Sequence, residues 1–234
     1  MPTLNEAGSL PHTLALLPQG LHELVVVDGR STDDTLSVVR TYRPDARIVM
    51  QRGRGKGDAL REGFAAATGD IIVMLDADGS TDPGEIPAFV HALTAGADFA
   101  KGSRHLPGGG STDFTWHREL GNRVLRGTVN LLFGTRYTDL CYGYNAFWRS
   151  CLPKIDLDCD GFEVETLMNI RAARAGLVVA EVPSFEHPRI AGESKLNAAR
   201  DGVRVLRTIV RERLRWGRPV RRGSLEEAPS GVSA

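Results

Sequence analysis

The sequence is poor in cysteine and lacks the spacings that hold zinc or frame disulfides. Cys141, Cys151 and Cys159 are its only cysteines, and they form no CxxC pair. An odd number at such spacings predicts reduced, packed thiols of a cytoplasmic protein. The six histidines show no metal-binding spacing either, so neither a zinc protein nor a disulfide-framed secreted domain is expected.

Long apolar runs are also missing. The longest unbroken run is Ile71–Leu75, far short of the roughly 20 residues that a membrane-spanning helix needs. No signal-peptide pattern is present at the N-terminus. We therefore expect any contact with a membrane to be made from one side.

A net charge is the third absence. Among 234 residues, 29 Lys and Arg balance 29 Asp and Glu, which argues against a nucleic-acid binder. The balance is uneven, because Arg189–Arg222 contains eleven Lys and Arg against three Asp and Glu. This basic region predicts an anionic partner such as phosphate or a membrane surface.

Short apolar runs alternate with segments of helical character, which predicts βαβ units and a mostly parallel sheet. Strands are expected at 24–27, 47–50, 71–75, 97–101, 144–148 and 178–182, and the longer helices at about 118–133, 162–175 and 196–216. Ser31–Asp34 has the form of a capping box, and Asp82 followed by Pro83 predicts another helix start. The predicted organisation is an α/β domain (1–198), an amphipathic basic helix (199–217) and a disordered tail (218–234).

Carboxylates stand where predicted strands end. Asp28 follows one apolar run, and Asp76 and Asp78 follow another. Ligands of an open parallel sheet bind beyond the carboxyl ends of its strands. Oxygen ligands without a nearby His or Cys suit Mg²⁺ or Mn²⁺, which fills its shell from a diphosphate. Either these residues hold a metal on a nucleotide diphosphate, or they only cap a turn.

The glycine-rich stretch Gly53–Gly57 has two interpretations. It lacks the spacing of a P-loop because Gly57 follows Lys56. It is therefore either a tight strand-to-helix turn or a loop whose Lys56 contacts a nucleotide phosphate. No G-x-G-x-x-G follows the first detectable strand, which disfavours a dehydrogenase.

Several short motifs, in this order, resemble family 2 glycosyltransferases, and most of all the branch of polyprenyl-phosphate sugar transferases that includes dolichyl-phosphate mannose synthase. They are Pro2-Thr-Leu-Asn-Glu6, Val26-Val-Asp28, Gly55-Lys-Gly57, Leu75-Asp-Ala-Asp-Gly79, Gly102-Ser-Arg104, Asp139 with Cys141-Tyr-Gly143, Gly161-Phe-Glu163 and Gly192-Glu-Ser-Lys195. The resemblance spans about residues 1–210 and implies a GT-A fold.

The resemblance also implies roles for individual residues. It places Pro2, Leu4, Glu6 and Asp28 at the base and ribose, Asp76 and Asp78 on the metal, and Arg189, Ser194 and Lys195 on a loop over the diphosphate. Ala77, between the two aspartates, and Lys56 of the glycine-rich loop are further candidates for binding the nucleotide sugar. It places Arg104, Arg118 and Arg123 at the phosphates of donor or acceptor.

The chain departs from the family pattern at two places. Gly29 stands where the family usually has a second Asp, so a ribose or base contact is expected to be missing. The family's first strand normally precedes the Pro2 motif, whereas this chain starts at Met1. That strand is expected to be missing here. Either this form is destabilised, because neighbouring backbone groups and apolar faces would be exposed, or the missing residues exist in the natural protein.

Glu163 and Glu165 are candidate catalytic residues. In relatives that glycosylate hydroxyls, a carboxylate in this region acts as general base. A phosphate acceptor needs no strong base, since its second pKa is about 6, and cations that position it matter more. The arginines favour the phosphate acceptor, while a solvated helix face remains the plainer interpretation of both glutamates.

The basic helix at 199–217 predicts a membrane contact. Val203, Leu206, Val210 and Leu214 fall in one stripe of roughly 80°, beside a stripe of arginines. Such a helix suits an anionic lipid surface, and it could also dock on a membrane protein or pack on the domain.

Together these features predict a metal-dependent, inverting hexosyltransferase. It moves a sugar from a nucleotide-diphosphate sugar to a polyprenyl phosphate, peripherally at the inner face of the membrane. Two alternatives stay open. One is a transferase of the same fold that acts on a hydroxyl group of a soluble glycan or natural product, and the other is a nucleotide-sugar-binding module without turnover.

Overall fold

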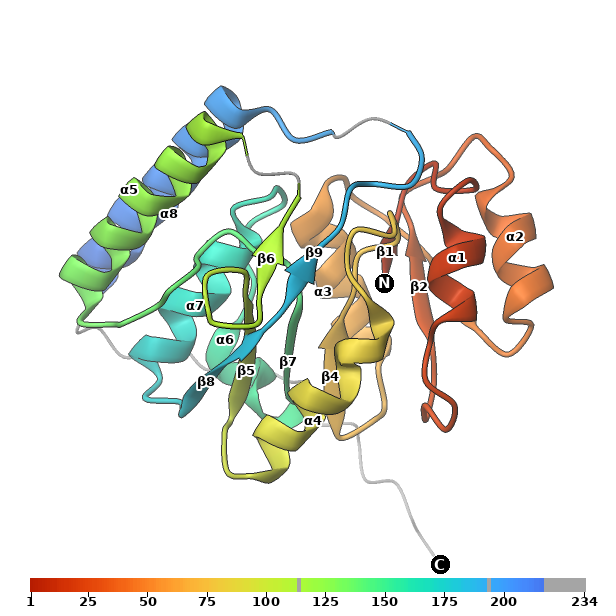
Figure 1. Cartoon of the computed structure of the whole chain (residues 1–234), viewed down its shortest axis with the longest axis horizontal. Helices are drawn as coiled ribbons and strands as arrows, with labels where there is room; N and C mark the ends of the chain where they lie inside the picture. The colour runs from red at the N-terminus through yellow and green to blue at the C-terminus, as the bar shows by residue number, and fades with distance from the viewer. Residues whose placement is uncertain (113–114, 193–194, 217–234) are drawn as a thin grey trace, which may run out of the picture.

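The strands of the computed structural model gather into three sheets (Figure 1). The structure describes residues 1–112, 115–192 and 195–216. The strands are β1 (Pro2–Thr3), β2 (Val25–Asp28), β3 (Arg47–Met50), β4 (Ile71–Met74), β5 (Phe99–Ser103), β6 (Gly110–Ser111), β7 (Asn145–Trp148), β8 (Val179–Pro183) and β9 (Phe185–Glu186).

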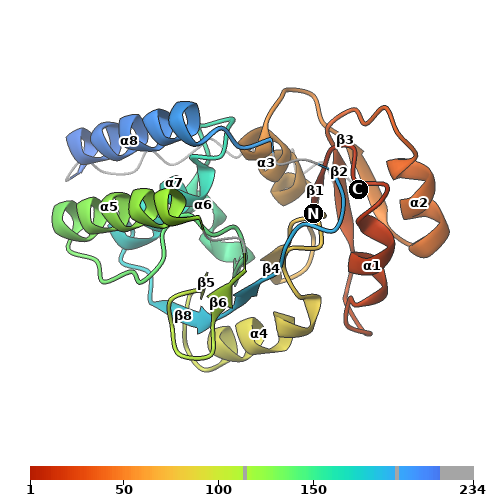
Figure 2. The same ribbon diagram turned by 45° about the horizontal axis from the view of Figure 1, so that its top comes forward.

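Helices cover these sheets and form a layer of their own at one end. They are α1 (Leu10–Ala15), α2 (Thr35–Tyr42), α3 (Lys56–Ala66), α4 (Ile86–Thr94), α5 (Trp116–Phe133), α6 (Leu152–Ile155), α7 (Val164–Arg174) and α8 (Ala198–Arg215). Figure 2 shows α5 and α8 side by side at the end of the molecule opposite α1 and α2.

Parallel pairing dominates, as the alternation of strands and helices predicts. The first sheet has the order β1-β2-β3 and is parallel throughout. The second has the order β4-β7-β5-β8; β5 and β8 are parallel, whereas β7 runs antiparallel to both β4 and β5. The α/β fold class is thus confirmed, with β7 as the exception that strand spacing does not reveal.

The two predicted helix starts have different outcomes. Asp82 caps its helical segment, since its Oδ1 accepts from the backbone N of Gly84 at 2.7 Å. Ser31–Asp34 does not form a capping box: Asp34, the N-cap of α2, makes no side-chain cap bond. Oδ1 of Asp33 instead accepts hydrogen bonds from the backbone N and the Oγ1 of Thr35. These two side chains shape the turn that holds the loop containing Glu6.

The core has four clusters, and one of them joins α8 to the rest of the chain. Val205 and Ile209 of α8 pack with Val129 and Phe133 of α5 and with Ile170 of α7. The predicted boundary at 198 coincides with the start of α8, but this helix shares a core with α5 and α7. The predicted tail, 218–234, lies outside the described residues.

The apolar stripe predicted on the basic helix is not the face that packs. Its members are exposed by 48% (Val203), 48% (Leu206), 50% (Val210) and 74% (Leu214). Among the described residues, no helix is long and apolar enough to cross a membrane.

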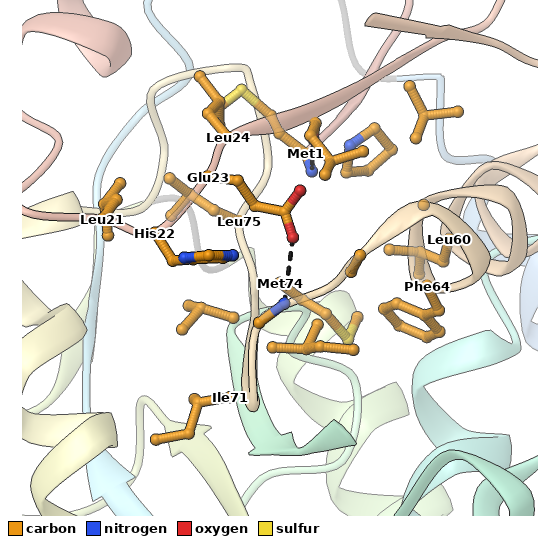
Figure 3. Close-up of a pocket in the computed structure, with 18 of the residues that line it drawn as sticks. Met1, Leu21, His22, Glu23, Leu24, Leu60, Phe64, Ile71, Met74 and Leu75 are labelled. Carbon is orange, nitrogen blue, oxygen red and sulfur yellow. Dashed lines mark hydrogen bonds between the residues drawn. The ribbon is translucent and has the colours of Figure 1, made fainter. Parts of the chain in front are cut away.

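A mostly apolar pocket of about 160 Å³ lies between β2 and β4 (Figure 3). Met1, Leu24, Leu60 and Met74 are among its lining residues. The Met1 amine donates to the carbonyl of Val25 at 2.9 Å, and burial lowers the pKa of that amine to about 6. This pocket contains none of the predicted catalytic residues, so the candidate site lies elsewhere.

Candidate active site

A second pocket of about 380 Å³ brings together most of the predicted site residues. Its lining includes Pro2, Leu4, Glu6, Lys56, Asp76, Ala77, Asp78, Arg104, Arg118, Glu165, Arg189 and Lys195. Three predicted residues do not line it: Asp28, Arg123 and Glu163. Ser194 lies outside the described residues.

Asp76 lies two residues after the end of β4 and is held by Lys56. The Nζ of Lys56 lies 2.8 Å from Oδ2 of Asp76 and 2.7 Å from Oε1 of Glu165, and its side chain is only 10% exposed. Burial alone would lower the pKa of Lys56, but the two carboxylates more than offset it and raise that pKa. The lysine is therefore a fixed cation between a strand end and α7.

Asp78 lies on the tight turn that follows. Its Oδ1 accepts from the backbone N and the Oγ of Ser80, at 3.0 and 2.7 Å. Gly79 adopts a φ of +76°, and a Cβ there would lie 2.4 Å from Cδ1 of Ile190. Glycine is therefore required both for the turn and for the close approach of the segment that carries Arg189.

The two carboxylates fit a hard divalent cation. Among the described residues, no group of three or more His, Cys, Asp or Glu is placed to hold a metal, so the described chain offers one or two carboxylates. That number suits Mg²⁺ or Mn²⁺ completed by phosphate oxygens. Oδ1 of Asp76 accepts no hydrogen bond from any described residue, which leaves it available as a ligand.

Arg189 links Asp78 to Glu6 across the pocket. Its Nη1 donates to both carboxylate oxygens of Glu6, at 2.8 and 2.9 Å, and its Nη2 lies 3.0 Å from Oδ2 of Asp78. Lys195 donates to the carbonyl of Leu4 nearby. Arg189 therefore pairs with Glu6 of the first motif and with Asp78 of the turn, and Lys195 bonds to Leu4 of the first motif.

Arg104 is buried among carboxylates. Its Nε and Nη2 donate to Asp139 at 2.7 and 3.0 Å, and its Nη1 donates to Glu186 at 2.9 Å. Burial would lower the pKa of Arg104, but the bond to Asp139 raises it. Burial would likewise raise the pKa of Asp139, which Arg104 holds below its usual range. The geometry gives Arg104 a positioning role at the pocket wall.

Glu186, which lines the pocket, and Asn122, which bonds to Asp139, had no sequence signal. Nδ2 of Asn122 donates to Asp139 at 2.9 Å, and its Oδ1 accepts from the backbone N of Leu140 and Cys141. Glu186 also accepts from Ser111 at 2.7 Å. A lone Asn inside a helix and a lone Glu in a two-residue strand are indistinguishable in sequence from surface residues.

Asp28 does not line the pocket. It is fully buried, and its carboxylate accepts from the backbone N and the Oγ of Ser31 at 2.9 and 2.6 Å. Ser31 in turn accepts from the backbone N of Asn5 at 2.9 Å. Asp28 therefore organises the loop that carries Glu6.

Glu163 and Arg123 do not line the pocket. Oε1 of Glu163 accepts from the backbone N of Gly161 at 3.3 Å, beside the start of α7. Arg123 is 63% exposed and pairs with Glu119, one turn away on α5. By contrast, Arg118, Arg200 and Arg204 line the pocket, and they come from the two helices that lie side by side.

Comparisons with known proteins identify the family of this chain. A model of glycosyl transferase family 2 matches residues 1–155. The undecaprenyl-phosphate mannosyltransferase of Micrococcus luteus is 32% identical over 229 residues, covering 93% of this chain and 92% of the relative. The polyprenol monophosphomannose synthase of Mycolicibacterium smegmatis is 35% identical over 214 residues, covering 85% and 80%.

A solved structure shares the fold. Glucosyl-3-phosphoglycerate synthase from Mycobacterium tuberculosis, in complex with Mn²⁺, uridine diphosphate and glucosyl-3-phosphoglycerate, superposes with a TM-score of 0.71 at 26% identity. The superposition covers 93% of this chain and 78% of that one. The predicted GT-A fold is thereby confirmed, and the chain belongs to glycosyl transferase family 2.

Proposed function

We propose that this enzyme transfers a sugar from a nucleotide-diphosphate sugar to a polyprenyl phosphate. The observation that carries the proposal is the make-up of the pocket. Two carboxylates suited to a metal lie on the turn after β4, while Arg118, Arg200 and Arg204 enter the pocket from α5 and α8. Two relatives are named for polyprenyl or undecaprenyl phosphate, which supports an acceptor that carries phosphate.

The donor is held with its diphosphate at the DADG turn, Asp76–Gly79. Asp76 and Asp78 would hold a metal there. When bound, this metal would neutralise the negative charge that develops on the departing nucleoside diphosphate. Lys56 pairs with Asp76, and Arg189 pairs with Asp78. Together with Lys195, which bonds to the carbonyl of Leu4, they bring positive charge to the turn. Mg²⁺ and Mn²⁺ both fit this set of oxygen ligands.

The acceptor phosphate needs no strong base. Its oxygen is already anionic near neutral pH, so it can attack the anomeric carbon in line and invert the configuration there. The arginines of α5 and α8 orient it. Glu165 is bound to Lys56 at 2.7 Å, which suits a positioning residue better than a base that takes a proton from a hydroxyl.

We further propose that α5 and α8 rest on the membrane that holds the acceptor. Both helices leave large apolar side chains exposed: Trp116, Leu120, Val124 and Leu131 on α5, and Val203, Leu206, Val210 and Leu214 on α8. Large exposed apolar patches on soluble proteins mark sites of interaction with other proteins or with membranes. With arginines beside it, this two-helix face suits an anionic leaflet at the inner side of the membrane.

The test is a donor screen with polyprenyl phosphate in detergent, reading out nucleotide release and lipid-linked sugar. We expect both products with the native chain. Asp78→Ala should reduce transfer by about a thousandfold or more, while Asp82→Ala, which removes only a helix cap, should cost about 1 kcal/mol of stability and little activity. Donor binding without turnover, or transfer to a soluble hydroxyl instead, would overturn the proposal.

A further inference from the structure

Both carboxylates of the DADG turn are held by protein cations, and these two cations differ in placement. The side chain of Lys56 is 10% exposed and forms ion pairs with both Asp76 and Glu165. Arg189 reaches Asp78 from a segment that is neither helix nor strand, and it is 23% exposed. Asp78 therefore carries the cation that is easier to displace.

Arg189 occupies the oxygen of Asp78 that a metal would need. Its Nη2 lies 3.0 Å from Oδ2, while Oδ1 accepts two bonds from Ser80. A divalent cation and a guanidinium on one carboxylate oxygen repel each other at close range. Binding of either one must therefore weaken binding of the other.

Glu6 gives Arg189 a second anion inside the pocket. It accepts twice from Nη1, at 2.8 and 2.9 Å, and its side chain is largely buried. Its backbone N donates to Oγ1 of Thr35 at 2.9 Å, which fixes the loop. Arg189 can thus leave Asp78 while it stays paired beside the donor site.

We propose that Asp78 exchanges Arg189 for the divalent metal when the donor binds. In the metal-free enzyme, Arg189 neutralises Asp78 and lowers its affinity for metal alone. When a metal enters with a nucleotide diphosphate, Arg189 gives up Asp78 and pairs with the diphosphate, so both cations are satisfied only in the full complex. This inference rests on the metal site of the proposed function.

The exchange predicts opposite effects of one substitution on two measured affinities. Mn²⁺ binding is followed by the loss of its free electron paramagnetic resonance signal, first without nucleotide and then with saturating UDP or GDP. Without nucleotide, Arg189→Ala should bind Mn²⁺ about tenfold more tightly than the native chain, because one charge-assisted competitor is gone. With nucleotide it should bind Mn²⁺ more weakly, because the diphosphate has lost its guanidinium.

Arg43→Ala is the matched control. Arg43 forms a bidentate pair with Asp45 at 3.0 and 2.9 Å, and neither residue lines the pocket. This variant loses the same charge and should leave both Mn²⁺ affinities unchanged. If Arg189→Ala does not fold, as judged by circular dichroism, Arg189→Lys replaces it. A lysine cannot span Glu6 and Asp78 at once, so its shifts should have the same signs and be smaller.

The outcomes separate the exchange from the metal site itself. Unchanged or weaker Mn²⁺ binding by Arg189→Ala without nucleotide would overturn the exchange and leave the metal site standing. If the native chain binds no Mn²⁺ even with nucleotide, the metal site and the exchange both fall. A loss of affinity under both conditions would mean that Arg189 only supports the local structure.

Discussion

Helices α4 and α8 are both amphipathic, yet α4 buries apolar side chains alone, whereas α8 buries charged side chains together with apolar ones. α4 buries Ile86, Phe89 and Leu93, as expected of a helix that covers a sheet. α8 buries Asp201 and Glu212 along with Val205, Thr208 and Ile209, while its apolar stripe stays exposed. An amphipathic pattern therefore predicts that a helix has two different faces, but it does not predict which face packs against the protein.

The reason lies in what each helix packs against. α4 lies on β5, β7 and β8, whose apolar side chains offer no partner to a charge. α8 lies against α7, where Arg171 and Arg174 come within 3.1 and 3.7 Å of Glu212. A buried carboxylate that is paired with arginines can be tolerated, whereas an unpaired one cannot.

The largest expected difference concerns apolar side chains at matched positions. Phe89→Ala on α4 should cost about 4 kcal/mol of stability, because it opens a cavity in a packed core. Leu206→Ala on α8 should stay within about 0.5 kcal/mol, because that side chain is half exposed. Urea unfolding of both variants measures this, and similar losses would mean that the Leu206 face is covered in solution.

The second prediction concerns the buried charge on α8. Glu212→Gln should cost about 3 kcal/mol, because it leaves the guanidinium groups of Arg171 and Arg174 without their buried anion. Glu119→Gln is the control: its pair with Arg123 is exposed, and its loss should cost less than about 1 kcal/mol. Equal costs in chemical denaturation would contradict the view that α8 is held by its charged face.

The third prediction concerns the exposed stripe of α8. Changing Leu206, Val210 and Leu214 together to Ser should weaken binding to anionic vesicles by at least about tenfold, with thermal stability nearly unchanged. The control changes three other exposed apolar residues to Ser: Leu16, Tyr42 and Met50. If both triple variants sediment equally with vesicles, α8 has no special role at a lipid surface.

The smallest expected effect is a dependence on pH. Burial would raise the pKa of Asp158, but Arg171 and Arg211 more than offset it and hold that pKa below its usual value. A depressed folded-state pKa gives stability that is present above the unfolded pKa, about 3.9, and is lost as pH falls through the folded value. Asp158 is 38% exposed, so this contribution is less than about 1 kcal/mol.

Melting curves between pH 7 and pH 3 measure this effect on the native chain and on Asp158→Asn. The native chain should lose stability relative to the variant as the pH falls below about 4. Parallel curves would show that Asp158 does not hold α8 through its charge.

Much of the fold followed from local pattern. β3 spans the residues predicted for it, and β2, β4, β7 and β8 lie within one or two residues of their expected positions, because β-branched runs between turn residues specify strands locally. Asp82 caps its helical segment because a cap bond depends only on neighbours in sequence. The antiparallel direction of β7 was missed, since it is set by packing between distant strands.

The candidate site was predicted in part. Most of the predicted motif residues line the pocket. Asp76 and Asp78 lie just after a strand, where they were expected. The partners that hold them lie far away in sequence: Glu165 is 109 residues from Lys56, and Glu6 is 183 residues from Arg189. No local pattern encodes such a pair, so Lys56 and Arg189 could be recognised as cations but not assigned to particular carboxylates.

By itself, the sequence determined the longer strands, the family and the two carboxylates that follow β4, because these depend on neighbouring residues and on motifs in a fixed order. Only the tertiary structure decided which face of α8 is buried, whether Asp28 lines the pocket, and which carboxylates Arg189 pairs with. The physical reason is the same in each case. A charged side chain is stabilised by whatever partner the fold brings within about 3 Å, and that partner is chosen by three-dimensional packing.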